Sequence, residues 1–152
     1  MERGQVIKIL DFYRNIEKEM RFNKKILLEL EDNYNPIETN NYEFNMHSKS
    51  SPTEEFALNI PEELSYRIKH IQEENLKLAR LKAEILKEIS SLNYTHKVIV
   101  YDFYLNNMKW VQISKQLNYS VRQCKNIRNV AIESLEDRFN KNKIIKEFNI
   151  PA

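Results

Sequence analysis

Side chains suited to recognising DNA bases are concentrated between residues 121 and 130. At helical spacing they share one outward face, and its polar members are Arg122, Gln123, Lys125, Asn126 and Asn129. Arginine and lysine can donate to O6 and N7 of guanine, and asparagine and glutamine can pair bidentately with adenine. The sequence therefore predicts these five residues as the base contacts of a DNA-binding protein.

Positive charge surrounds this face. Lys109, Lys115 and Arg128 are predicted to contact phosphates, which position a protein on DNA without specifying a sequence. The stretch that holds all these residues contains no Asp or Glu. Residues 93–152 carry 10 Lys+Arg against 5 Asp+Glu, whereas residues 1–92 carry 14 against 17. This uneven charge favours a polyanionic partner.

Two short helices joined by a tight turn are expected to hold this face outward. The turn is Asn118-Tyr119-Ser120, whose serine is a good N-cap for the helix that follows. The inward positions are apolar at helical spacing: Trp110, Ile113 and Leu117 in the helix from about 109 to 117, then Cys124, Ile127, Ala131 and Leu135 in the next. A short helix, a three-residue turn and a second helix form the helix-turn-helix pattern.

A further helix is expected before these two. We predict that Thr95 caps it and that Asn106-Asn107 ends it, because asparagine tolerates a left-handed backbone. Residues 93–140 would then form a three-helix DNA-binding domain, with a tail over residues 141–152. The chain has one glycine in 152 residues, and tight β-hairpins need glycine, so an all-α fold is predicted.

Residues 1–92 are expected to form long helices that support oligomerisation. One amphipathic helix is predicted from about Gln5 to Asp32, followed by a linker over residues 33–50. A second helix is expected to start at Ser51-Pro52-Thr53-Glu54 and to restart at Pro61. Its apolar positions recur mostly by threes and fours, in a coiled-coil-like stripe: Leu64, Ile68, Ile71, Leu78, Ile85, Ile89 and Leu92, with Asn75 in the same seam.

The stripe allows two interpretations. A buried asparagine can fix the register of a dimeric coiled coil, so self-association into a homodimer is favoured. Alternatively, the stripe packs on the first helix of the same chain.

Other function classes are disfavoured by what the sequence lacks. We expect no catalytic residues, no cofactor and no enzyme activity, because no Gly-rich phosphate loop or defensible nucleophile-base pair occurs. The single cysteine and three scattered histidines predict no metal site. No stretch is long and apolar enough for a membrane span or a signal peptide, so a cytoplasmic location is expected.

Residues 94–139 resemble the region-4 helix-turn-helix of sigma factors. They are even more similar to small phage-encoded activators of the ArpU/RinA type, in which a "small-x-Trp-x-x-Ile-Ala/Ser-x-x-Leu" helix is followed by "Tyr-Ser" and a helix ending in "Ala-Leu/Ile-x-x-Leu". Here these motifs are Met108–Leu117, Tyr119-Ser120 and Ala131–Leu135. The sequence departs from the pattern at Asn107-Met108, because the turn before the tryptophan often carries glycine in the family, and at Ser114, where alanine is usual.

The resemblance implies a sequence-specific regulator of phage or prophage late genes, an activator without sigma region 2. Its base contacts would lie in the first two turns of the third helix, at Arg122, Lys125 and Asn126. The implied partners are double-stranded DNA and RNA polymerase. Two alternatives stay open: a DNA-recognition subunit of a packaging motor, similar to a small terminase, and a module that docks on RNA polymerase without binding DNA.

Overall fold

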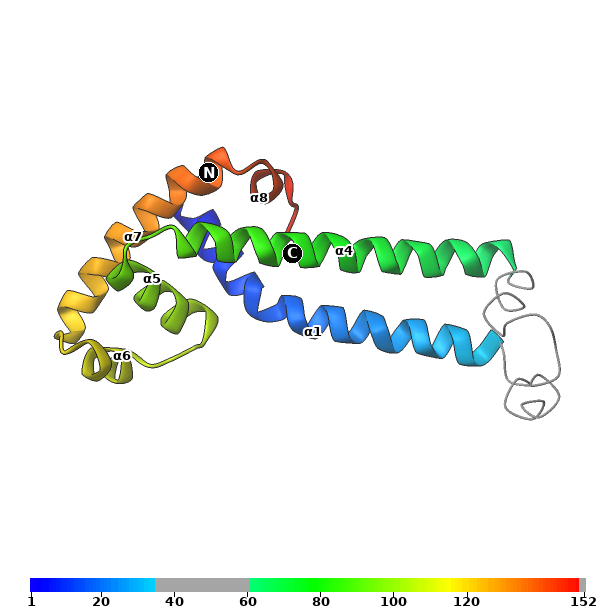
Figure 1. The fold of residues 1–152 in the computed structure, drawn as a ribbon, viewed down its shortest axis with the longest axis horizontal. Coiled ribbons are helices and arrows are strands. Elements are labelled where there is room, and N and C mark those ends of the chain that lie inside the picture. The colour runs from blue at the N-terminus through cyan, green and yellow to red at the C-terminus, as the bar shows by residue number, and fades with distance from the viewer. Residues whose placement is uncertain (35–60, 151–152) are drawn as a thin grey trace. The chain divides into compact units, whose positions relative to one another are not determined.

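The computed structural model describes residues 1–34 and 61–150. Most of the expected linker over 33–50, and the expected helix start at Ser51–Glu54, lie outside the described residues. Within the described part no strand occurs, which confirms the predicted all-α fold. The elements shown in Figure 1 are α1 (Arg3–Tyr34), α4 (Glu62–Ser90), α5 (Tyr94–Val100), the π-helical turn η1 (Tyr101–Leu105), α6 (Trp110–Leu117), α7 (Val121–Lys141) and α8 (Lys143–Glu147).

The helices divide between two compact units. The first unit comprises Met1–Lys18 and Lys77–Ala152, and the second comprises Glu19–Leu76. Both α1 and α4 contribute residues to each unit. This division differs from the expected boundary between residues 92 and 93, because the start of α1 and the end of α4 pack with the C-terminal helices.

The first unit buries an apolar core between α1 and α4. The start of α1 and the end of α4 bury their apolar stripes in it, and Lys82 of α4 forms an ion pair with Glu17 of α1. The α1 and α4 side chains that lie in this core are Val6, Ile9, Leu10, Phe12, Ile16, Leu78, Leu81, Ile85 and Ile89. In this unit, the apolar stripe predicted for α4 therefore packs within the same chain.

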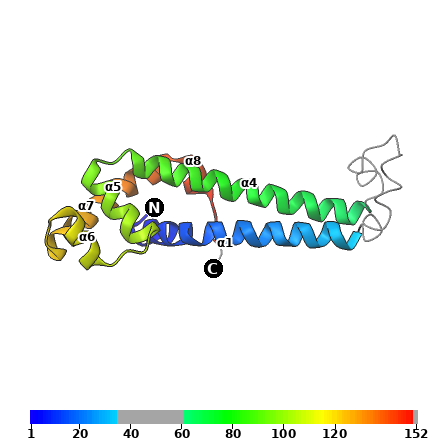
Figure 2. The same ribbon diagram turned by 60° about the horizontal axis from the view of Figure 1, so that its bottom comes forward.

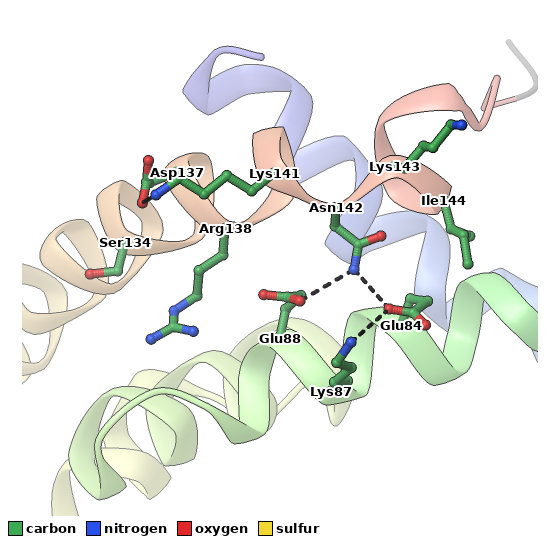
Figure 3. Close-up of a pocket in the computed structure, with 10 residues that line it drawn as sticks. All are labelled: Glu84, Lys87, Glu88, Ser134, Asp137, Arg138, Lys141, Asn142, Lys143 and Ile144. Carbon is green, nitrogen blue, oxygen red and sulfur yellow. Dashed lines mark hydrogen bonds and ion pairs between the residues drawn. The ribbon is translucent and has the colours of Figure 1, made fainter.

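Residues 141–152, expected to be a tail, contribute a helix to the first unit. Ile145 of α8 is buried, and the ring of Phe148 lies 5.8 Å from the ring of Phe12, centroid to centroid. Asn142 caps α8 by accepting a hydrogen bond from the backbone N–H of Ile145 at 3.2 Å. Its amide nitrogen also donates to Glu84 at 2.8 Å and to Glu88 at 3.2 Å on α4 (Figure 3).

The second unit contains an antiparallel pair of helix segments from α1 and α4. Asn23 of α1 donates a side-chain hydrogen bond to Asn75 Oδ1 at 2.8 Å, and Asn75 Nδ2 donates to the carbonyl of Met20 at 3.4 Å. The asparagine expected to set a dimer register is thus paired inside the chain, as the alternative interpretation of the stripe held. Self-association through this region remains a prediction.

Candidate nucleic-acid interface

The helix before the predicted recognition pair begins two residues earlier than expected and ends in a π-helical turn. Asn93, and not Thr95, caps α5, since its side chain accepts a hydrogen bond from His96 N at 3.0 Å. Thr95 lies inside the helix, so its predicted capping role is wrong. The helix continues into η1, where Asn106 N donates to Tyr101 O at 2.9 Å. The extra residue of this π turn is a feature found frequently at functional sites.

Two asparagines form the corners of the helix-turn-helix. Asn107, between η1 and α6, has a φ of 57°, and Asn118, after α6, has a φ of 58°. A left-handed backbone normally favours glycine, and asparagine is among the few other residues that adopt it at low cost. Asparagine can therefore form both corners without glycine.

The turn between α6 and α7 is fixed by side-chain hydrogen bonds. Ser114 Oγ donates to the carbonyl of Tyr119 at 2.6 Å, a contact that alanine could not make. Ser120 caps α7 as predicted, because its Oγ accepts from Gln123 N at 3.1 Å. The two serine hydroxyl groups therefore stabilise the turn that orients α7.

A small core holds the three helices together. Ile99, Ile113 and Cys124 are fully buried at its centre, and the residues packed around them are Phe103, Met108, Trp110, Leu117, Tyr119 and Ile127. The Trp110 ring stacks on Phe103 at 4.1 Å between centroids. The predicted core positions of α6 and α7 are confirmed. Burial raises the pKa of the Cys124 thiol, which stays protonated at neutral pH.

The first two turns of α7 present most of the predicted base contacts to solvent. Arg122, Gln123, Lys125 and Asn126 are all exposed. Lys109 and Lys115 are exposed at opposite ends of α6. Figures 1 and 2 show α5 and α6 against the first half of α7, so these side chains belong to one small structural unit.

Arg128 and Asn129 are placed differently from the other six predicted contacts. Both are half-buried, and the Arg128 guanidinium lies 5.3 Å from the centre of the Trp110 ring. Burial raises the pKa of the Tyr104 hydroxyl, and the charge and hydrogen bond of Arg128 oppose that rise. Arg128 thus interacts with two aromatic side chains, Trp110 and Tyr104. Its contact with a phosphate stays a prediction.

The start of α1 reaches this region, which the sequence did not indicate. Arg3 Nη2 donates to Asn129 Oδ1 at 2.6 Å, and Arg14 Nη1 donates to Asn107 Oδ1 at 2.9 Å. One arginine thus contacts α7 and the other contacts the corner before α6. No periodicity or motif links residues so distant in the chain, so only the tertiary structure could find these contacts.

A second concave surface lies between α4, α7 and α8 (Figure 3). Its lining mixes Glu84, Glu88 and Asp137 with lysines and Arg138, and Asp137 pairs with Lys141 at 3.0 Å. The hydrogen bonds of Asn142 to the two glutamates join α4 to the start of α8, whereas the Asp137–Lys141 pair lies within α7.

Nowhere in the described part of the chain do three or more His, Cys, Asp or Glu side chains come together as a metal ion would require. Within residues 1–34 and 61–150, every helix is too short or too polar to cross a bilayer.

No known protein family matches the chain, and no curated protein or solved structure is similar to it.

Proposed function

We propose that this protein is a sequence-specific DNA-binding regulator of transcription that inserts the start of α7 into the major groove. The observation that carries the proposal is the exposed, acid-free surface of the first two turns of α7, where Arg122, Gln123, Lys125 and Asn126 lie. Recognition helices of helix-turn-helix proteins make base contacts from these turns. These residue types have the donors and acceptors that distinguish base pairs in the major groove.

The geometry around α7 supports this role. The turn before α7 is held by Asn118, Ser114 and Ser120, so the exposed side chains start from a well-defined backbone. Lys109, the N-cap of α6, and Lys115, in its last turn, are exposed and are the proposed phosphate contacts.

The biological role we propose is activation of late genes of a phage or prophage. It rests on the resemblance of Met108–Leu117 and Ala131–Leu135 to activators of the ArpU/RinA type. In this proposal the protein acts with RNA polymerase and as a homodimer. A dimer would place its two recognition helices in successive major grooves, about 34 Å apart.

Selection of bound fragments from a random duplex library, with the full-length chain, tests the proposal. A recovered consensus sequence is expected, and its symmetry would report the number of subunits bound. The Arg122→Ala variant should then discriminate less between the consensus and random DNA, by about 1–3 kcal/mol at one base pair. Arg80→Ala, which removes an exposed arginine of α4, is the matched control and should leave discrimination unchanged.

Three results would contradict the proposal. Failure to bind any duplex at low salt would favour a module that docks on a protein, because phosphate contacts alone give measurable affinity under those conditions. Rings of many subunits in light scattering would favour a packaging subunit. If Arg122→Ala discriminates between the consensus and random DNA as well as the unsubstituted chain does, Arg122 does not contact a base.

A further inference from the structure

The hydrogen bonds of Asn129 restrict what it can offer to a ligand. Its Oδ1 accepts from Arg3 Nη2 at 2.6 Å and from Arg128 Nε at 3.0 Å. Both partners are guanidinium groups, which only donate, so the atom between them must be the amide oxygen. The amide NH2 group of Asn129 is left to face other partners, and it can only donate.

This restriction conflicts with base recognition by Asn129. Bidentate pairing with adenine needs the amide oxygen to accept from N6 while the amide nitrogen donates to N7. Because two arginines already occupy both lone pairs of its oxygen, Asn129 cannot make that pair without breaking at least one of these contacts. An amide that only donates suits an anionic oxygen instead.

The neighbouring side chains have the same chemistry. Lys125 precedes Asn129 by one helical turn, so the two lie on the same flank of α7, and Lys125 is exposed. Arg3 is exposed and contacts Asn129, and among the described residues it forms no ion pair. Lysine, arginine and the asparagine NH2 together give a flank with donors and two positive charges.

We propose that Arg3 and Asn129 on this flank bind the phosphate backbone of duplex DNA, beside the candidate base contact Lys125. α1 thereby supplies a contact to the DNA interface from the other end of the sequence, and Asn129 is a phosphate contact and not a base contact. The inference rests on the proposed DNA-binding function. Arg128 acts as a positioning residue, since it stacks on Trp110 and orients the amide of Asn129.

The first test is the Asn129→Asp variant of the full-length chain. A carboxylate keeps the shape of the side chain and can still accept from both arginines, so the fold should be retained; circular dichroism checks this. The two donors become acceptors, which repel a phosphate. Affinity should fall by a similar factor for a random-sequence duplex and for the selected consensus, leaving their ratio unchanged.

The second test measures the salt dependence of binding to a random-sequence duplex. Each phosphate contact contributes about 0.9 to the slope of log affinity against log salt. Arg3→Gln should therefore reduce the loss of affinity between about 50 and 200 mM salt by about 3.5-fold. Arg3→Lys, which keeps the charge, should restore the slope. Arg80→Gln, the control on α4, should leave it unchanged.

These outcomes separate the inference from the proposed function. If no duplex is bound by the unsubstituted chain, the proposed function fails and the inference with it. If Arg122→Ala lowers discrimination while Asn129→Asp and Arg3→Gln change nothing, the chain recognises DNA and the flank does not contact it. If Asn129→Asp lowers affinity for the consensus alone, Asn129 contacts a base and the inference is overturned.

Discussion

The two units of this protein share two helices and a single hydrophobic pattern, but they differ in burial. In α4, apolar residues recur from Leu64 to Ile89 at similar spacing throughout. Those in the first unit are buried, with Ile85 fully inaccessible. Among the described residues of the second unit none is buried, and four large apolar side chains are exposed: Phe22, Leu28, Tyr66 and Leu76.

The difference shows what an amphipathic pattern can and cannot specify. Periodicity predicts which face of a helix is apolar, but the depth of burial depends on how many elements cover that face. In the first unit, residues of α7 and α8 join the core, including Ile132, Phe139 and Ile145. The described part of the second unit consists of segments of α1 and α4 alone.

The sharpest way to break this comparison is to shorten two isoleucines of the same stripe. Ile85→Ala should lower the free energy of unfolding by about 2–5 kcal/mol, because it leaves a cavity in a closed core. Ile68→Ala, at a half-buried position of the second unit, is the matched control and should cost about 1 kcal/mol or less. Urea unfolding followed by circular dichroism measures both costs, because the described parts of both units are helical. Equal costs at the two sites would show that the second unit is as well packed as the first.

A backbone effect confined to the first unit is predicted at the corner after α6. Asn118→Val should destabilise the protein by about 1–2 kcal/mol, because a β-branched residue is strained at a φ of 58°. Asn118→Gly should be neutral or stabilising. Asn106→Val is a control at another helix end, where φ is −89°. Thermal unfolding measures all three, and an equal loss at Asn106 would refute the conformational argument.

In the second unit, the polar pair across the two helices offers a smaller effect. Asn75→Leu should cost about 1 kcal/mol, because Asn23 loses the acceptor of its hydrogen bond. Replacing both asparagines with leucine should recover that loss, since two apolar groups need no hydrogen bond. Sedimentation of each variant reports whether Asn75 affects the oligomeric state. A double variant as unstable as the single one would count against pairing within the chain.

The smallest expected effect is a gradual fall in the stability of the first unit at alkaline pH. Burial raises the pKa of Tyr13, Tyr104 and Cys124, and Tyr101 adds to the rise at Tyr13. As the pH rises, the unfolded chain therefore loses these protons before the folded chain does. The contribution of these groups to the free energy of unfolding is fully present below a pH of about 8.5 and falls as the pH rises further. Urea unfolding from neutral to alkaline pH should show this decline. Tyr104→Phe should flatten it, and a profile identical to that of the unsubstituted chain would exclude Tyr104 as a source.

Much of the candidate site could be predicted from local sequence. The turn at residues 118–120, the cap at Ser120 and the exposed face at Arg122 and Asn126 depend on contacts only a few residues apart. Such contacts follow from helical periodicity and from capping chemistry. This is why the predicted core of α6 and α7 agrees with the structure.

The rest depends on long-range packing. Arg3 meets Asn129, and Phe12 meets Phe148, because α1 and the C-terminal segment belong to one unit. Neither contact has a periodic signal. The π turn at Tyr101–Leu105 was also missed, since the segment has the composition of an ordinary helix. The cap is Asn93 and not Thr95, two residues away. Both residue types favour the N-cap position, so residue type alone could not decide between them.

The first unit is made from two pieces of chain, and this has a consequence for synthesis on the ribosome. Residues 1–18 cannot pack in this unit until residues 77–152 have been synthesised, and 58 residues lie between the two pieces. At translation rates of about 5–20 residues per second, the delay before residue 77 is joined to the chain is roughly 3–12 s. During that interval the apolar stripe of Val6, Leu10 and Ile16 lacks its native partners. The unit proposed to bind DNA can therefore complete its core only after its last helices are made.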